Sequence, residues 1–525
     1  MDSKEISLLT YAVADNEMCL LVKMGPYRIL LDCGLKDISY LLTEQKKPAD
    51  LVIVSHAHSD HARGLLNLHR KYPQLPIYAS EVTTELLHLN WLDEGENPRF
   101  CQALPWRTPI EFAEGLYAEL FSSGHLPGAA SILLTYNNEL RDYTVFYTGD
   151  FFLSNSRLAE GLHLEELRGL KPDVLILEGS YGTSRHPHRR QQENQLAERI
   201  NQAITENNSV ILPVPTLGLG QELLMLLRSH HLFTGRDLDI WVDGSVAAGC
   251  DIYLQLLQYL PNSVQNFARN QPLFWDERVR PRVRRLLPEQ KELLGQIPCI
   301  IMTDEDADFS EYLKSGNWVL LIAQQPGHEI NTDSGLFTRV ETYLLAQHSD
   351  GLGTTQLIHN LRPQHIVFVH SSPTYLADLT SLEELRNRYQ LHSPGAGYFV
   401  ELPVGEVFLQ PSIPNESNYQ GQLTEFDDFI SMTLPTILSN DPRWQSFSDT
   451  GFIEVRWQGE ELVIRGISQK EVLNQFSVSK ISPDVECCVN CSYYRGQKCY
   501  NFDSPLYSFK VTPDGVCPFF AFPDN

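Results

Sequence analysis

The sequence lacks any long hydrophobic run. No stretch approaches the roughly 20 apolar residues that a membrane-spanning helix needs. The first residues, MDSKEISLLTYAVADNE, carry acidic side chains and no apolar core of the kind found in secretory signals. No repeat of solenoid type is present, which excludes an array of stacked units. We therefore expect a cytoplasmic protein that binds no membrane.

Positive charge is also scarce. The chain of 525 residues has 41 Lys and Arg against 66 Asp and Glu, a formal net charge of −25. This surplus opposes indiscriminate coating of nucleic acid. It does not exclude a nuclease, because a bound metal centre adds positive charge where the substrate lies. The hydrophobic content of 42% is that of an ordinary globular protein. The length of 525 residues is enough for several domains.

The pattern of short apolar runs predicts an α/β protein. β-branched runs at 173–180, 209–216, 238–245 and 318–325 alternate with helical segments such as 191–204 and 221–230. This alternation is typical of buried parallel strands connected by helices. Towards the C-terminus, residues 452–468 read as a hairpin.

A cluster of metal-binding residue types follows the run LVIVS. His56, His58, Asp60 and His61 lie within six positions, in the order H-x-H-x-D-H. His56 and His58 project to the same side of an extended chain, and Asp60 and His61 follow as a helix begins. Leaving such groups buried without partners would destabilise the fold by several kcal/mol. A divalent metal removes that penalty, so the cluster predicts a metal site rather than satisfied core histidines.

Three further polar residues occur where strand-like runs end. Asp32 ends RILLDCG, His125 lies in SSGHLPGAAS and Asp150 ends TVFYTGD. Read singly, Asp150 could be a turn former or helix cap, and His125 an ordinary loop residue. Their position at strand ends matches that of the histidine cluster, so we include them among the candidate site residues.

Together, HAHSDH, SSGHLPGAAS and YTGD resemble the successive signatures of the metallo-β-lactamase superfamily. The resemblance implies an αβ/βα sandwich with its ligands along one edge. It also implies that His56, His58 and His125 hold one metal, that Asp60 and His61 hold part of a second, and that Asp150 bridges them. Asp32 would then be a supporting residue that orients ligands from behind.

Two divalent metals, zinc or alternatively manganese or iron, would lie roughly 3.5–4 Å apart and share a hydroxide nucleophile. Such a pair can hydrolyse a phosphodiester or a carbonyl compound. The metals therefore predict hydrolysis without choosing the substrate.

Later residues resemble the β-CASP branch of the same superfamily, which contains ribonuclease J and the pre-mRNA cleavage endonuclease. SVILPVPTLGLGQELLMLL and LDIWVDGSVAAGCDIY are similar to its inserted domain, and Glu178, His348 and His370 follow in the order of its motifs. By this similarity His370 completes the second metal site. Glu178 orients His348, which contacts the scissile phosphate and can protonate the leaving oxygen.

The resemblance gives a domain division. We expect a metallo-β-lactamase domain over 1–182 and 346–410, interrupted by a β-CASP insert over 183–345. A linker and small α+β segment over 411–480 and a cysteine-rich module over 481–525 follow.

Arginines form two clusters in the acidic background. Such runs are most often solvated or paired with acids, and the alternative is a path for a phosphate backbone. The candidate contacts are Arg185, Arg189, Arg190, Arg278 and Arg282.

The C-terminal end concentrates half of the ten cysteines. One close pair, Cys488 and Cys491, is followed by single residues Cys499 and Cys517, with Cys487 as a spare. Four thiolates can bind zinc, although a zinc ribbon usually has a second close pair, which keeps an iron–sulfur cluster as an equal alternative.

These observations favour a metal-dependent nuclease that acts on RNA, with DNA as an alternative substrate. A small-molecule ester or thioester hydrolase and an inactive scaffold subunit of a processing complex are the competing hypotheses. A homodimer or a processing complex would be the protein partner.

Overall fold

The structure is a computed structural model. It describes residues 6–14, 16–42, 47–94, 99–138, 141–324 and 337–405, and the shorter segments 422–425, 430–433, 453–458, 461–466, 488–495, 498–501, 504, 511 and 520–521. The chain divides into two compact units, Met1–Glu416 and Ser417–Asn525. In the described part of the chain, no helix is both long and apolar enough to cross a membrane.

Two seven-stranded sheets, built from segments before and after an inserted region, form the main part of the larger unit. The first sheet has the order β20-β1-β2-β3-β4-β5-β6 and contains β1 (Ile6–Ala14), β2 (Glu17–Met24), β3 (Tyr27–Leu31), β4 (Leu51–Ile53), β5 (Ile77–Ser80), β6 (Cys101–Leu104) and β20 (Phe399–Glu401). The second has the order β19-β18-β11-β10-β9-β8-β7 and contains β7 (Ile110–Ala113), β8 (Leu116–Ser122), β9 (Ala130–Asn137), β10 (Asp142–Tyr147), β11 (Val174–Glu178), β18 (His365–Val369) and β19 (Gln390–His392).

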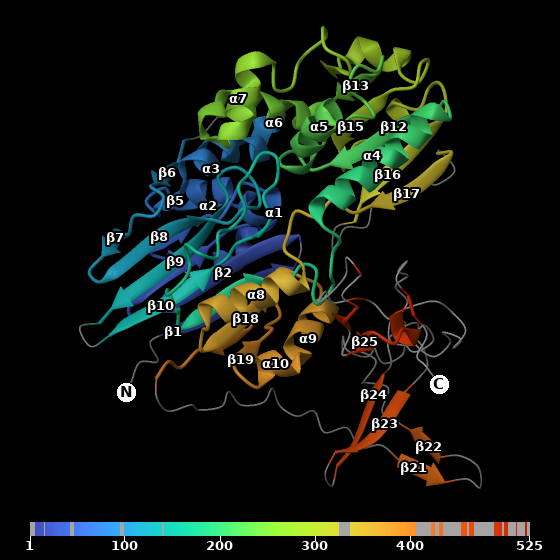
Figure 1. Cartoon of the computed structure of the whole chain (residues 1–525). Helices are drawn as coiled ribbons and strands as arrows, with labels where there is room; N and C mark the ends of the chain where they lie inside the picture. The colour runs from blue at the N-terminus through green and yellow to red at the C-terminus, as the bar shows by residue number, and fades with distance from the viewer. Residues whose placement is uncertain are drawn as a thin grey trace. The chain divides into compact units, whose positions relative to one another are not determined.

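The two sheets pack face to face and carry helices on their outer faces. Leu20 and Ile132, from different sheets, belong to one buried apolar cluster between them. Outside the first sheet lie α1 (Ser59–Ala62), α2 (Leu65–Lys71) and α3 (Glu81–Leu86), and outside the second lie α8 (Gly351–Leu361), α9 (Pro373–Ser381) and α10 (Glu383–Arg386) (Figure 1). This is the expected αβ/βα sandwich, and the fold prediction is confirmed.

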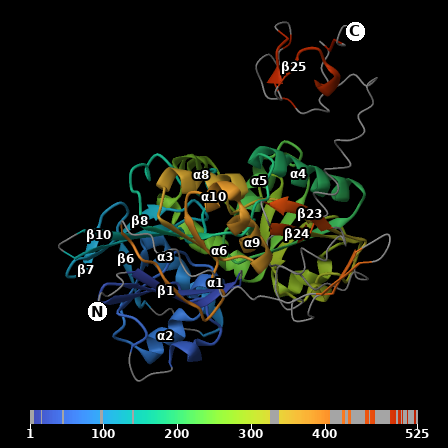
Figure 2. The same cartoon turned by 90° about the horizontal axis from the view of Figure 1, so that it is seen from below.

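A third sheet of six parallel strands is inserted between β11 and β18. Its order is β14-β13-β15-β12-β16-β17, with β12 (Ser209–Val214), β13 (Asp239–Val242), β14 (Arg282–Arg285), β15 (Ile300–Asp304), β16 (Trp318–Ala323) and β17 (Arg339–Tyr343). Its helices are α4 (Arg189–Thr205), α5 (Leu219–Ser229), α6 (Gly244–Gln255) and α7 (Asn262–Asn270), and α4 and α5 lie side by side in both views (Figure 2). The parallel strands predicted from continuous apolar runs are present, because both faces of β12 and β15 are buried.

Polar residues lie where the sandwich strands end. Asp32 follows β3 and His56 follows β4, and these two strands are parallel neighbours. In the other sheet, Asp150 follows β10, Glu178 ends β11 and His370 follows β18, and these three strands are also parallel neighbours. The carboxyl ends of parallel neighbours meet at one edge of a sheet, so residues distant in sequence reach one place.

The strands in the described residues of the smaller unit form three short hairpins. They pair β21 (Gln422–Glu425) with β22 (Ile430–Thr433), β23 (Ile453–Gln458) with β24 (Glu461–Gly466), and β25 (Tyr494–Arg495) with β26 (Lys498–Cys499). The second of these is the hairpin expected at residues 452–468.

Candidate metal centre

The histidine cluster lies in the turn from β4 to α1. The chain stays extended from His56 to His58, and α1 begins at Ser59. The rings of His56 and His58 are 4.9 Å apart between centroids, on the same side of the chain as expected. Asp60 and His61 lie in the first turn of α1 and reach a second position.

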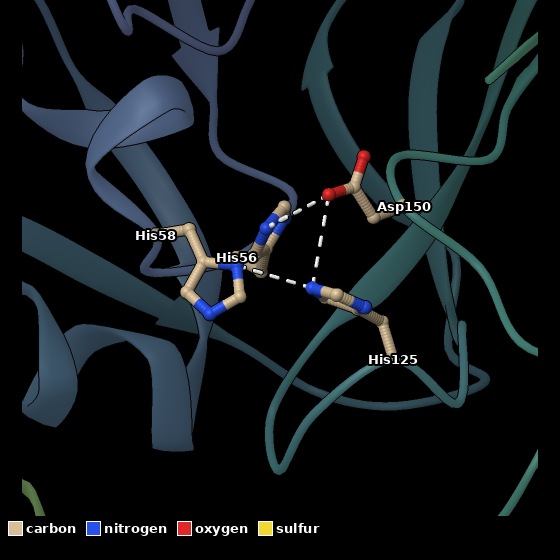
Figure 3. A group of neighbouring side chains, drawn as sticks. All are labelled: His56, His58, His125 and Asp150. Atoms are coloured by element: carbon tan, nitrogen blue, oxygen red, sulfur yellow. Dashed lines mark hydrogen bonds and ion pairs between the residues drawn. The ribbon is translucent and has the colours of Figure 1, made fainter. Parts of the chain in front are cut away.

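A first group of four side chains gathers beside this turn. His56, His58, His125 and Asp150 each offer one ligand atom, and these atoms all lie within 4.8 Å of one another. The side chains point toward one another from three separate loops, those after β4, β8 and β10 (Figure 3). Asp150 Oδ2 lies 3.4 Å from His56 Nε2 and 3.7 Å from His125 Nε2. Three imidazoles and a carboxylate are a donor set that suits zinc and related divalent metals.

A second group shares Asp150 with the first. It consists of Asp60, His61, Asp150 and His370, again with ligand atoms within 4.8 Å of one another. His61 Nε2 lies 3.4 Å from Asp150 Oδ1, and His370 Nε2 lies 3.2 Å from Asp60 Oδ2. His370 has a φ of 53°, a backbone conformation that is unusual outside glycine and often found at functional sites. One carboxylate thus lies between two clusters of potential ligands.

Asp150 reaches this position because a glycine precedes it. Gly149 has a φ of 55°, and a Cβ atom there would lie 2.7 Å from the Cβ of Ser55. A larger residue would therefore push the loop after β10 away from the histidine cluster.

Asp32 supports the second group from behind. Its Oδ2 lies 2.8 Å from His61 Nδ1 and accepts a hydrogen bond from the Tyr147 hydroxyl at 2.6 Å. Its other oxygen accepts from the Ser55 backbone N–H. Asp32 is fully buried and belongs to neither group of potential ligands. Its carboxylate therefore fixes the His61 ring so that Nε2 faces Asp150.

Unpartnered buried atoms test whether a metal fits. His56 Nε2, His61 Nε2 and Asp150 Oδ1 are buried and have no hydrogen-bond partner. Buried polar atoms nearly always have a hydrogen-bond partner. Three buried atoms without one, all in the same place, therefore indicate that they bind a ligand. Burial lowers the pKa of His56 and of His125, which keeps both rings neutral and able to bind a cation.

The orientation of two imidazole rings gives a second test. His58 Nε2 lies 3.2 Å from the Leu217 carbonyl oxygen, and His125 Nδ1 lies 3.0 Å from the Gln347 carbonyl oxygen. Carbonyl oxygens only accept, so in neutral rings these two nitrogens carry the protons. The remaining nitrogens, His58 Nδ1 and His125 Nε2, then face each other with lone pairs at 3.1 Å. A cation between them turns this repulsive arrangement into ligation, so the residues present fit a divalent metal.

A histidine–glutamate pair lies next to both groups. His348 Nδ1 is 2.7 Å from Glu178 Oε2 and 3.9 Å from Asp150 Oδ2. Burial would lower the pKa of His348, but the charge and hydrogen bond of Glu178 outweigh it and raise the pKa. Glu178 also accepts a hydrogen bond from the Phe151 N–H at 2.5 Å, which fixes it beside the loop that carries Asp150.

The predicted arginines differ in their surroundings. Arg189 contacts Glu193 and Glu222, Arg278 contacts Asp276, and Arg282 lies 2.5 Å from Asp239. Arg185 and Arg190 are exposed and have no ion pair among the described residues. The acids at Arg189, Arg278 and Arg282 neutralise the charge that a phosphate backbone would need.

The predicted cysteine site is described only in part. Cys488 and Cys491 share one tight turn, with the Cys491 N–H donating to the Cys488 carbonyl at 3.0 Å, and Cys499 lies on β26. Cys487 and Cys517 lie outside the described residues. The three described thiols are absent from the groups whose ligand atoms all lie within 4.8 Å, a search restricted to the described residues.

Some supporting groups gave no signal in the sequence. Ser55 and Tyr147 hold Asp32, and the carbonyl groups of Leu217 and Gln347 hold two histidine rings. Every residue has a backbone carbonyl, so only the tertiary structure reveals which ones face the site.

The sequence is similar to those of several known proteins. The profile described as "Beta-lactamase superfamily domain" matches residues 27–205. A Synechocystis protein, "Uncharacterized protein sll0514", is 49% identical over 98% of this chain and 96% of its own length. "Probable RNase MJ4" of Methanocaldococcus jannaschii is 31% identical over 50% of this chain and 64% of its own length. "Cleavage and polyadenylation specificity factor 73" of Drosophila melanogaster is 24% identical over 69% of this chain and 59% of its own length.

The chain thus spans less than two thirds of the last two relatives. The resemblance noted in the sequence is confirmed by these matches together with the sandwich and its inserted sheet. The chain belongs to the β-CASP branch of the metallo-β-lactamase superfamily, whose members bind divalent metals.

Proposed function

We propose that the protein is a metal-dependent phosphodiester hydrolase that cuts RNA. The observation that carries this proposal is the pair of ligand groups that share Asp150, with His348 and Glu178 directly beside them. Two of the relatives carry names that describe RNA cleavage or RNA processing, which supports RNA over other substrates.

Each ligand has a proposed place. His56, His58 and His125 would hold one cation, and Asp60, His61 and His370 would hold the other, with Asp150 common to both. Divalent cations there would lower the pKa of water and neutralise negative charge on a phosphodiester. Zinc suits the imidazole-rich first group best, with manganese and iron as alternatives.

His348 is the residue that we assign to the leaving group. Its Nδ1 faces Glu178, so the other ring nitrogen is free to face a substrate. From that position it would donate a hydrogen bond to a phosphate oxygen and a proton to the departing oxygen. Glu178 keeps the ring in this orientation.

The His348–Glu178 pair favours a substrate with an alkoxide leaving group, such as a phosphodiester or an ester, over a thioester. An alkoxide leaving group needs a proton, whereas a thiolate departs without one. The inactive-scaffold hypothesis is disfavoured, because every predicted ligand of the two groups is present and converges.

The exposed residues Arg185 and Arg190 are the proposed contacts for the RNA backbone. Arg185 lies on the segment that follows Glu178 and leads into α4, and Arg190 lies in the first turn of α4. We further propose the division 1–182, 183–345 and 346–410 for the two larger domains, followed by 411–480 and 481–525. A homodimer or processing complex stays a prediction.

End-labelled RNA and DNA of matched sequence test the proposal. We expect purified protein to cleave the RNA, to lose this activity with a chelator and to regain it with added metal. Preferential cleavage of the DNA would correct the substrate. Turnover of small acyl esters with no cleavage of either nucleic acid would overturn the proposal.

We also propose a separate metal site at the C-terminus, formed by Cys488, Cys491, Cys499 and Cys517. The turn that joins Cys488 to Cys491 supports it, because two cysteines separated by two residues commonly bind one metal. Anaerobic purification followed by zinc, iron and sulfide analysis distinguishes zinc from an iron–sulfur cluster. Equal metal content in the wild type and in the Cys491→Ser variant would contradict the site.

A further inference from the structure

The inserted sheet contacts a metal ligand directly. β12 ends at Val214, and three residues later the carbonyl oxygen of Leu217 lies 3.2 Å from His58 Nε2. His58 belongs to the sandwich, whereas Leu217 belongs to the insert. This contact joins residues separated by 159 positions in the sequence.

A second backbone carbonyl, on the segment that returns from the inserted sheet to the sandwich, lies beside it. The carbonyl of Gln347, four residues after the end of β17, lies 3.0 Å from His125 Nδ1. The two carbonyls come from adjacent places, because a Cβ atom on Gly218 would lie 3.3 Å from the Gln347 side-chain nitrogen and 3.8 Å from His58 Nε2. The carboxyl ends of β12 and β17 therefore meet the first ligand group.

We propose that the Leu217 carbonyl is a positioning group that makes cation binding at the first ligand group depend on the seating of the insert. This inference rests on the proposed metal-dependent function, since it requires a cation at that group. The carbonyl holds the proton of His58 at Nε2 and so directs the Nδ1 lone pair at the cation. When the insert moves away, His58 loses both the tautomer and the ring orientation that ligation needs.

The conformation of Gly218 sets the position of this carbonyl. Gly218 has φ 88° and ψ −89°, a combination that residues with a Cβ atom avoid. The Leu217 carbonyl is part of the planar peptide that joins Leu217 to Gly218, so a change in the φ of Gly218 rotates that oxygen. Substitution of Gly218 is therefore a way to move a backbone carbonyl without removing a ligand.

The Gly218→Ala variant is the first test. The added methyl group has almost enough space, and its nearest neighbour is the end of the flexible Gln347 side chain. The effect therefore comes from the backbone. We expect one of the two cations to bind about 10- to 100-fold more weakly, while the other keeps its affinity.

Gly235→Ala is the matched control. Gly235 also has a positive φ, 79°, lies in the same inserted region and has no atom within 4 Å of a Cβ position. It introduces backbone strain of the same kind away from the site. We expect Gly235→Ala to lower stability and leave both cation affinities unchanged.

The measurement is a zinc titration of chelated protein in competition with a chromophoric chelator. The His125→Ala variant identifies which step belongs to the first group. If Gly218 had only a structural role, the Gly218→Ala substitution would weaken both zinc-binding steps of the titration together or neither of them. Wild-type affinities at both steps in Gly218→Ala would overturn the inference.

A milder variant tests the same inference if Gly218→Ala does not fold. The Thr216 hydroxyl lies 2.5 Å from the Ser245 hydroxyl and ties the loop to α6. Thr216→Val keeps the size of the side chain and removes this contact, so we expect a smaller loss at the first group alone. Unchanged affinity in a folded Thr216→Val variant, where Gly218→Ala does not fold, also overturns the inference. If wild-type protein binds no cation, the proposed function itself fails, which is a distinct outcome.

Discussion

His348 Nδ1 lies 2.7 Å from Glu178 Oε2, although 170 positions separate the two residues in the sequence. The pair joins the end of a sandwich strand, β11, to the segment that returns from the inserted sheet. The nearest Asp150 oxygen is 3.9 Å from the same nitrogen. The proton donor that we propose is therefore fixed beside the shared carboxylate by a residue of a different segment.

Removal of the His348 ring should reduce catalysis without removing metal. We expect His348→Ala to lower the rate of RNA cleavage about 10²- to 10⁴-fold, the range typical of a lost general acid, with cation content unchanged. His359→Ala is the control, because His359 lies on α8 and contacts Tyr389. Loss of both cations in His348→Ala would show that the ring is a ligand.

Glu178 should act through His348. Glu178→Gln keeps the shape of the side chain and removes its charge, so we expect slower cleavage with metal retained. In the presence of His348→Ala, the glutamine substitution should have little further effect on the rate, because its target is already gone. Multiplicative losses in the double variant would indicate a separate role for Glu178.

Asp150 should be required for both cations. It belongs to both groups of potential ligands, whereas Asp60 belongs only to the second. Asp150→Ala is expected to abolish metal-dependent cleavage and to lower metal content more than Asp60→Ala does. Metal analysis by mass spectrometry compares the two variants. Full cleavage activity in Asp150→Ala would refute its role.

A pair of histidines in contact, His365 buried and His392 partly buried, should make stability depend on pH. His365 Nδ1 lies 3.1 Å from His392 Nε2. Two effects lower the pKa of His392 to about 4: mainly its burial and, to a smaller extent, repulsion from the charge of His365. The unfolded chain, with a histidine pKa of about 6.5, binds the proton more readily between these values. The contribution of His392 to the free energy of unfolding is therefore fully present above about pH 6.5. It is lost as the pH falls towards 4, and the loss is at most about 3 kcal/mol.

The variant His392→Gln isolates this contribution. We expect its urea midpoint to decline less than that of the wild type when the pH is lowered from 7 to 4.5. Parallel declines in both proteins would contradict the assignment to His392.

The convergence of the candidate ligands could be predicted from the sequence because local order encodes it. His56, His58, Asp60 and His61 fall within one turn, and Asp150 and His370 follow β10 and β18, which flank β11 and run parallel to it in one sheet. The carboxyl ends of the strands in such a sheet lie at one edge. Polar residues that directly follow apolar runs are therefore predicted to lie close together in the fold.

Other features depend on tertiary contacts that no local pattern contains. The Leu217 carbonyl reaches His58 only because the inserted sheet folds against the sandwich. Likewise, the run that contains Arg278 and Arg282 shows positive charge, but Asp237 and Asp239 pair with Arg282 from another segment. The sequence shows that such a run is positively charged. Only the structure shows whether nearby acidic residues already neutralise that charge.

The rate of RNA cleavage against equivalents of Zn²⁺ returned to chelated protein tests the central claim most directly. Two cations that share Asp150 predict no cleavage by the chelated protein and full recovery at about two equivalents per chain beyond the zinc that the C-terminal cysteines bind. Undiminished cleavage of RNA by protein shown to be free of metal would contradict the account.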